Sequence, residues 1–219
     1  MNALKKGKST LKILALSGVL ETIFYLTHVV AGRMIWKDYN PIAQPISDLT
    51  ADTAISHTVA SNISYGYSFF NMVFCIVLLI YFKKEVKVNK TFYTGLVIKA
   101  VAELLSTFGY KLFPLSDTAW SNSFQNTMHF AITGVIVIGY IVLAILLTIG
   151  LAKTKKYPGM TRFMALFSTV FIVSGFMTVV AANEFPQYAG LVERVNLYSL
   201  MTSNVALALW MFNINTKEG

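Results

Sequence analysis

Residues 124–150 read FQNTMHFAITGVIVIGYIVLAILLTIG, a run of 27 residues without any Asp, Glu, Lys or Arg. The hydrocarbon layer of a bilayer is about 30 Å thick, and a helix of roughly 20 apolar residues crosses it. The length and composition of this run therefore predict a membrane-spanning helix over 124–150.

Five more stretches, on either side of this one, have the same character. The chain is 55% hydrophobic and 13% charged, with a mean hydropathy of +0.59, whereas about a quarter of the residues of a soluble domain are charged. A core of 219 residues is too small to bury so much apolar surface, so lipid must be the solvent for much of it. We expect an all-α protein with one domain over 1–219, a polytopic bundle of six transmembrane helices near 12–35, 60–82, 91–113, 124–150, 161–182 and 194–213.

Basic residues account for the net charge of +8 and predict the orientation of the bundle. They gather in short clusters between the apolar stretches, and no basic domain stands apart, so we expect no nucleic-acid partner. With the N-terminus inside, thirteen Lys and Arg residues fall in cytoplasmic segments and four in outer segments. Cytoplasmic loops of membrane proteins carry this excess, so both ends of the chain are predicted to lie in the cytoplasm.

Two of the spans carry ionisable residues that we expect to turn away from lipid. Charged groups inside a bilayer are costly, so they are functional candidates by default. Glu21 and His28 lie on one small and polar face of the first span. Lys99 and Glu103 lie four residues apart in the third span, where opposite charges neutralise each other, and we interpret them as a structural pair. The plainer interpretation of His28 is a buried, hydrogen-bonded histidine.

The outer rim of the predicted bundle concentrates polar side chains that could perform chemistry. Ser47, Asp117 and His129 fall at or just below the outer surface, and a serine, an acid and a histidine can form a nucleophile, an orienting group and a base. His129 and Asp117 could instead bind a metal together with His28 or His57.

The same rim residues also have plainer interpretations. Ser47 or Asp48 could cap a short helix that follows the first span. Asp117 could be solvated in its loop, or it could pair with Lys111 or Arg194.

Three sequence elements resemble a known family. Residues 39–49, YNPIAQPISDL, are similar to the Tyr-x-Pro-x-x-Gln-x-Ile-Ser-x-Leu signature of the bacterial membrane proteins of the domain-of-unknown-function 998 family. Residues 113–117, FPLSD, followed by a histidine, resemble its second marker, and residues 190–194, GLVER, resemble its third. The resemblance implies a multi-pass protein of the bacterial inner membrane with six helices, but it implies no activity. The family-marking positions are Ser47, Asp117, His129, Glu193 and Arg194.

We favour a lipid-handling function at the outer leaflet. In this hypothesis a polar pocket takes a membrane lipid or a small amphipathic substrate, and the protein could be a hydrolase or a transferase. Asp117, His129 and Ser47 would be catalytic without any metal or other cofactor, and Arg194 would hold an anionic headgroup. The other candidate ligand-binding residues are Glu193, Glu21, His28, Asp48 and Glu103.

Two alternative functions remain open. One is a small proton-coupled transporter that uses Glu21, His28, Lys99 and Glu103 as a relay near the midplane. All five prolines fall in loops, so no span shows the broken helix that many transporters have, which disfavours this alternative. The other is a non-catalytic membrane scaffold or immunity-type protein that works through contact with a partner, for which the sequence has no positive signature.

Overall fold

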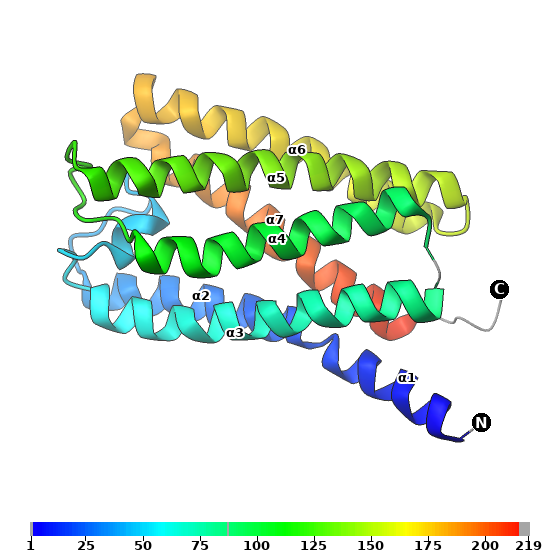
Figure 1. Ribbon diagram of the computed structural model, residues 1–219. Helices are drawn as coiled ribbons and strands as arrows, with labels where there is room; N and C mark the ends of the chain where they lie inside the picture. The colour runs from blue at the N-terminus through cyan, green and yellow to red at the C-terminus, as the bar shows by residue number, and fades with distance from the viewer. Residues whose placement is uncertain (1, 87, 215–219) are drawn as a thin grey trace.

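The computed structural model describes residues 2–86 and 88–214 of the chain, and the regular structure within them is all helical (Figure 1). The long helices are α1 (Asn2–Leu14), α2 (Ser17–Ile35), α3 (His57–Tyr81), α4 (Lys90–Leu112), α5 (Phe124–Thr154), α6 (Pro158–Glu184) and α7 (Ala189–Asn213). Three short helical segments join them, η1 (Ile46–Thr50), the π-helical η2 (Phe82–Val86) and η3 (Pro186–Tyr188). The predicted all-α class is confirmed.

Six helices in the described part of the chain are long and apolar enough to cross a membrane, and each overlaps one of the predicted spans. They are Ser9–Ile35, His57–Val86, Lys90–Leu112, Phe124–Thr154, Pro158–Glu184 and Pro186–Asn213. Their outward faces are apolar, and Phe69, Phe108 and Phe176 are 63%, 57% and 68% exposed. Water-soluble monomers rarely expose such a surface, so the chain is a multi-pass membrane protein.

The helices run alongside one another and form a bundle (Figure 1). Helix α2 packs mainly on α3, α4 on α5, and α6 on α7, and α7 also contacts α2. Lys12 donates from Nζ to the carbonyl oxygen of Ile214 at 2.7 Å, so the end of α1 lies beside the end of α7. We call this end of the bundle the terminal end, and the opposite end, with loops 36–56 and 113–123, the loop end. Which end faces the cytoplasm stays a prediction.

The first span is interrupted, although the sequence predicts one continuous helix over 12–35. The chain turns after Leu14, between α1 and α2, and the N–H of Gly18 bonds to the carbonyl of Ala15, three residues back, at 3.0 Å. The Ser17 hydroxyl donates to the Leu14 carbonyl at 2.7 Å. A serine hydroxyl that bonds the backbone in this way competes with the regular helical pattern, so α2 begins with a new direction.

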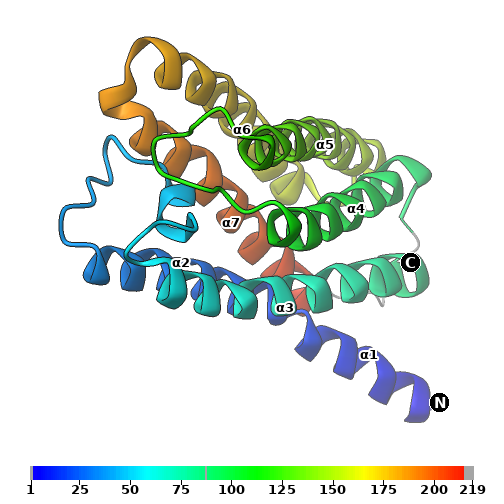
Figure 2. The same cartoon turned by 60° about the vertical axis from the view of Figure 1, so that its left-hand side comes forward.

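The loop between α2 and α3 folds back over the loop end. Its short helix η1 lies between α2 and α7 (Figure 2) and also contacts α3. Ile46 and Leu49 of η1 are buried. The N–H of Asp52 donates to the carbonyl of Leu115 at 2.8 Å, which joins this loop to the loop 113–123. These contacts position the polar residues of the rim.

Candidate functional site

Arg194, the predicted headgroup-binding residue, is fixed by the loop between α2 and α3. Its side chain is 8% exposed. Nη1 donates to the carbonyl oxygens of Pro41, Gln44 and Gly190 at 2.6, 2.9 and 2.8 Å. Nη2 donates to the hydroxyl of Tyr39, and the guanidinium carbon lies 5.5 Å from the centroid of the Tyr39 ring. Protein acceptors therefore occupy both terminal nitrogens of Arg194.

Backbone groups complete this contact, which we call the loop clasp. Its members are the backbone of 41–46 and the residues Tyr39, Gly190, Glu193 and Arg194. The N–H of Ile46 donates to Oε2 of Glu193 at 2.5 Å, and the N–H of Gly190 donates to the carbonyl of Ala43 at 3.1 Å. A Cβ on Gly190 would lie 2.2 Å from the carbonyl oxygen of Gln44, so only glycine fits there. The first and third family-like elements of the sequence are thus two halves of one contact.

Asp48 joins the two loops of the loop end. Its side chain is buried, and its Oδ1 accepts a hydrogen bond from Nε1 of Trp120 at 3.1 Å. Burial raises the pKa of Asp48 to about 6, although the Trp120 bond and the charge of Arg194 lower it. Trp120 has a φ of 54°, a strained conformation for a residue other than glycine. Neither Ser47 nor Asp48 caps η1, because Pro45 precedes that helix and the Asp48 carboxylate is bonded to Trp120, so the capping interpretation is wrong.

Asp117 is held by its own loop. Its carboxylate accepts hydrogen bonds from the N–H of Ser121 at 3.0 Å, the Ser121 hydroxyl, the Ser116 hydroxyl at 2.8 Å and the Asn126 amide at 3.3 Å. The bonds from Ser121, followed by the bond from Ser116, hold the pKa of Asp117 well below its ordinary value. The ion pair that the described residues form joins Lys99 to Glu103. The interpretation that Asp117 pairs with Lys111 or Arg194 is therefore wrong.

The predicted nucleophile, acid and base do not contact one another. Nδ1 of His129 lies 3.0 Å from the carbonyl oxygen of Phe113, and the His129 ring packs on Tyr110 with centroids 4.8 Å apart. Ser47 is half-buried within η1. No hydrogen bond joins Ser47, Asp117 and His129 among the residues described. Catalysis by these three residues stays a prediction.

The metal site that the sequence suggested is not formed. In residues 2–86 and 88–214, no group of three or more His, Cys, Asp and Glu side chains could hold a metal ion. The proposed ligands, His129 and Asp117 with His28 or His57, each have a different environment. Asp117 bonds to its own loop, and Nδ1 of His57 lies 3.0 Å from the carbonyl oxygen of Thr50. The metal interpretation is therefore wrong.

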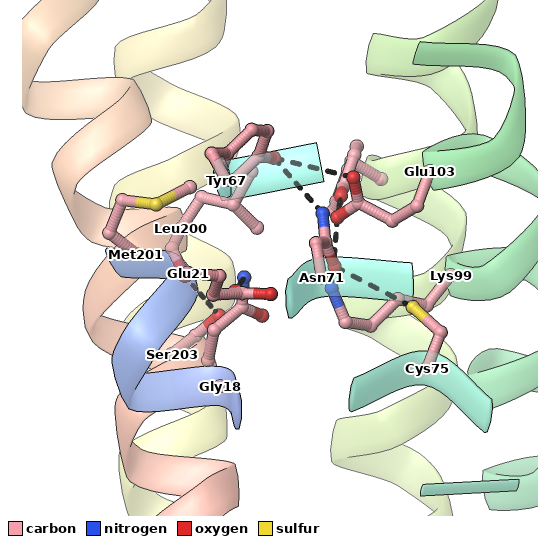
Figure 3. A network of polar contacts seen from close by, with 12 residues as sticks. Gly18, Glu21, Tyr67, Asn71, Cys75, Lys99, Glu103, Leu200, Met201 and Ser203 are labelled. Carbon is pink, nitrogen blue, oxygen red and sulfur yellow. Dashed lines mark hydrogen bonds and ion pairs between the residues drawn. The ribbon is translucent and has the colours of Figure 1, made fainter. Parts of the chain in front are cut away.

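A second polar group lies inside the bundle (Figure 3). Nζ of Lys99 and Oε1 of Glu103 form the predicted ion pair, 2.9 Å long, with both side chains 2% exposed. The Tyr140 hydroxyl donates to the same Oε1, and the Tyr67 hydroxyl donates to Oε2 at 3.3 Å. Donors from α3, α4 and α5 therefore meet at Glu103 and stabilise it as an anion.

The hydrogen-bonded network continues along α3. Nδ2 of Asn71 donates to the Tyr67 hydroxyl at 3.1 Å, and the Cys75 thiol donates to Oδ1 of Asn71 at 3.7 Å. Nζ of Lys99 lies 6.0 Å from the centroid of the Phe74 ring. Aromatic faces attract a cation at such distances, so Lys99 is held by one carboxylate and by nearby rings.

Glu21 faces this network from α2 and is only partly satisfied. Its side chain is 0% exposed, and its Oε1 accepts a hydrogen bond from Nδ2 of Asn204 on α7 at 2.5 Å. Its Oε2 has no hydrogen-bond partner among the described residues. Figure 3 shows the carboxyl group directed toward Lys99 and Asn71. Even so, Lys99 forms its ion pair with Glu103 and not with Glu21.

A second unpartnered atom lies on the same face of α2. Nδ1 of His28 has no hydrogen bond in the described part of the chain, and His28 is buried. The ring of Tyr25 lies edge-on to His28, with centroids 4.8 Å apart, and edge-on to Tyr67 at 5.3 Å. Tyr67 in turn bonds to Glu103. The Tyr25 ring therefore packs between His28 and Tyr67, and Tyr67 is hydrogen-bonded to the buried ion pair.

The charged members of this network were predicted from the sequence, but their partners Asn204, Tyr67 and Tyr140 were not. Tyr67 precedes Asn71 by one helical turn and Asn204 follows Asn196 by about two turns, so helical spacing was a usable signal for both. The only sign of Tyr140 was a hydroxyl group in an otherwise apolar stretch.

The two best-defined cavities lie elsewhere. One, of about 180 Å³, lies between α4 and α5, and the other, of about 220 Å³, lies between α6 and α7. Their walls are almost entirely apolar, with residues such as Val97, Val101 and Val135 in the first and Phe163 and Leu166 in the second. Neither is the polar pocket that the sequence suggested, and Glu21 lines neither of them.

Comparison with known proteins identifies one related family. The family described as "Protein of unknown function (DUF998)" matches residues 19–210. No curated protein and no solved structure matches the chain. The matched range contains the whole loop clasp and the whole buried network.

Proposed function

The chain belongs to the DUF998 family of proteins of unknown function, and we propose that this multi-pass membrane protein is a small proton-coupled carrier. One observation carries the proposal: the buried carboxyl group of Glu21 has an unpartnered Oε2 and faces the Lys99–Glu103 ion pair (Figure 3). Ionisable side chains inside a bilayer are characteristic of proton and ion pathways.

The charges of these three residues support proton binding by Glu21. Lys99 and Glu103 neutralise each other, and Glu103 also accepts two tyrosine hydroxyl bonds. Glu21 has one amide donor and no direct cation. Because a buried anion with so little compensation is very unfavourable, we expect Glu21 to carry a proton on Oε2. Glu21 is then the member of the group that changes charge.

Loss of this proton would change how the helices contact one another. The ionised Glu21 would compete with Glu103 for Lys99, whose long side chain can move between two carboxylates. A shift of Lys99 would weaken its pair with Glu103 and release the Tyr67 and Tyr140 hydroxyls. Because these residues belong to α2, α3, α4 and α5, protonation at one site would bias the packing of the bundle, which is the coupling that a carrier requires.

The loop end offers a route for the proton. His28 lies seven residues beyond Glu21 on α2, toward the loop end, and its Nδ1 has no partner in the described chain. Tyr25 lies between His28 and Tyr67. This order of residues leads from the rim to the buried ion pair.

The lipid-handling function has less support. Arg194, which would hold an anionic headgroup, donates to three carbonyl groups and one hydroxyl of the protein. Asp117 accepts bonds from its own loop, and His129 bonds to the backbone. These side chains organise the loop end. A scaffold function has no residue-level observation in its favour.

The test is proton movement in proteoliposomes that contain a pH-sensitive dye. A panel of cationic, anionic and neutral solutes is added outside, and at least one is expected to change the internal pH with the wild-type protein. The Glu21→Gln variant keeps an acceptor for Asn204 but cannot release a proton, so it should be inactive. Glu184→Gln changes an exposed carboxyl group at the end of α6 and should behave as the wild type. A Glu21→Gln variant as active as the wild type would overturn the proposal.

A further inference from the structure

We infer that the carried solute is a small organic cation with a primary ammonium group, which replaces the proton on Glu21. This inference rests on the proposed function and names the class of its substrate. It follows from the charge of the buried site and from the Oε2 of Glu21, which has no partner among the described residues.

The buried site requires one more positive charge. Glu21, Lys99 and Glu103 together carry one net negative charge when all three are ionised, and they are 0%, 2% and 1% exposed. Uncompensated charge is very unfavourable at such burial. A proton or a monovalent cation restores neutrality, and the two exclude each other. A neutral or anionic solute does not restore it.

The groups around Glu21 do not supply this charge. Lys99 is the cation among them, and Glu103 already pairs with it. The others are hydroxyl, thiol, imidazole and amide groups. By helix, the groups that face or adjoin the site are Tyr25 and His28 on α2, Tyr67 and Cys75 on α3, Lys99 and Glu103 on α4, Tyr140 on α5 and Asn204 on α7.

The unpartnered oxygen of Glu21 favours an ammonium group over a metal ion. Oε2 of an ionised Glu21 is a hydrogen-bond acceptor without a partner in the described residues, and a primary ammonium group is a donor. The rings of Tyr25 and Tyr67 pack edge-on with centroids 5.3 Å apart, and tyrosine faces attract organic cations. A metal cation requires several oxygen ligands, and in the described residues no group of three His, Cys, Asp or Glu side chains could hold one.

The exchange conserves charge. The O–H bond of Glu21 breaks and its proton leaves to water, while an N–H of the ammonium ion forms a hydrogen bond to the Oε2 that is exposed by this loss. One cation enters for each proton released. Glu21 is fully buried in this conformation, so binding includes a step that separates α2 from its neighbours, and association should be slower than simple diffusion.

The test is calorimetry with propylammonium chloride and the purified protein in lipid nanodiscs. Titrations in buffers of different ionisation enthalpy give the number of protons released. We expect one proton for each propylammonium bound, and an affinity that rises about tenfold per pH unit while Glu21 stays protonated. Glu21→Gln should lose binding, and Glu184→Gln should keep it. The proton count in the wild type does not depend on how any variant folds.

Control salts and one spectroscopic readout separate the outcomes. Tetramethylammonium has no N–H donor and should bind about tenfold more weakly or worse, and equal binding would overturn the inference. Proton release by sodium chloride but not by propylammonium would also overturn it. If the infrared band of the Glu21 carboxyl group titrates and no ammonium ion releases a proton, the inference is wrong while the proposed function stands. If that band is absent at every pH, both are wrong.

Discussion

Asn204 on α7 donates its side-chain amide to Oε1 of Glu21 on α2 at 2.5 Å, across 183 positions of the sequence. This bond fixes which oxygen of the carboxyl group is free, because Oε2 then faces Lys99 without a partner. Asn204 is therefore a positioning residue for the proposed proton site.

Asn204→Leu should destabilise the protein, because it leaves both oxygens of a buried carboxyl group without a donor. An unsatisfied buried polar group costs about 1–3 kcal/mol, and the expected loss in unfolding free energy is of that size. The measurement is denaturant unfolding in detergent. Asn183→Leu is the control, since Asn183 is exposed near the end of α6. Equal stability of both variants would show that the Glu21–Asn204 bond contributes nothing.

Lys99→Met should destabilise the bundle strongly, because it leaves Glu103 as an unpaired charge at 1% exposure. Breaking one partner of a buried ion pair costs about 3–5 kcal/mol. The double variant Lys99→Met with Glu103→Gln should recover part of this loss, since it removes the remaining charge. A double-mutant cycle in unfolding free energy measures the recovery. If the loss of unfolding free energy in the double variant equals the sum of the losses in the two single variants, Lys99 and Glu103 are not coupled.

Gly190→Ala should loosen the loop clasp, because its Cβ would lie 2.2 Å from the carbonyl oxygen of Gln44 and the loop would have to move. Hydrogen exchange of the backbone N–H groups of Ile42, Ala43, Gln44 and Ile46 is expected to become at least about tenfold faster, which corresponds to roughly 1.4 kcal/mol of local opening. Gly159→Ala is the matched control, since a Cβ on Gly159 would meet no atom within 4 Å. Unchanged exchange in Gly190→Ala would mean that the clasp does not hold the loop.

Closure of the loop end should weaken as the pH rises toward neutrality. The pKa of Asp48 is about 6 in the folded loop and 3.8 ordinarily, so the folded loop binds this proton more tightly than the open one. Its contribution is complete below pH 3.8 and is lost as the pH rises through about 6. The shift corresponds to about 1–3 kcal/mol.

Asp48→Asn separates this effect from others at the loop end. It keeps an oxygen acceptor for Trp120 and removes the charge, so hydrogen exchange in the loop should be slower than in the wild type at neutral pH and should depend less on pH in this range, after correction for intrinsic rates. The pKa of Asp117 is shifted in the opposite direction, so its contribution is present above pH 3.8 and is lost only in stronger acid. A pH dependence as large in Asp48→Asn as in the wild type would contradict the role of Asp48.

The fold could be predicted because the bilayer imposes a length and a polarity on every span. That constraint identified the helix over 124–150 and the five others within a few residues. The turn between α1 and α2 could not be predicted, since it depends on one hydrogen bond from Ser17 to the Leu14 carbonyl inside an apolar run.

The site could be predicted only in part. The Lys99–Glu103 pair follows from spacing within one helix, but the Glu21–Asn204 bond joins two helices, and spacing cannot show such a contact. The prediction of a ligand-binding residue at the outer rim had a different weakness. Arg194 appeared free to bind a ligand, but its acceptors are backbone carbonyl groups, which have no signature in the sequence.

The most direct measurement is the protonation state of Glu21 by infrared difference spectroscopy in nanodiscs at neutral pH. We predict a protonated carboxyl band in the wild type that disappears in Glu21→Gln and persists in Glu103→Gln and Glu184→Gln. A wild-type spectrum in which Glu21 is ionised at neutral pH would contradict the proposed proton site.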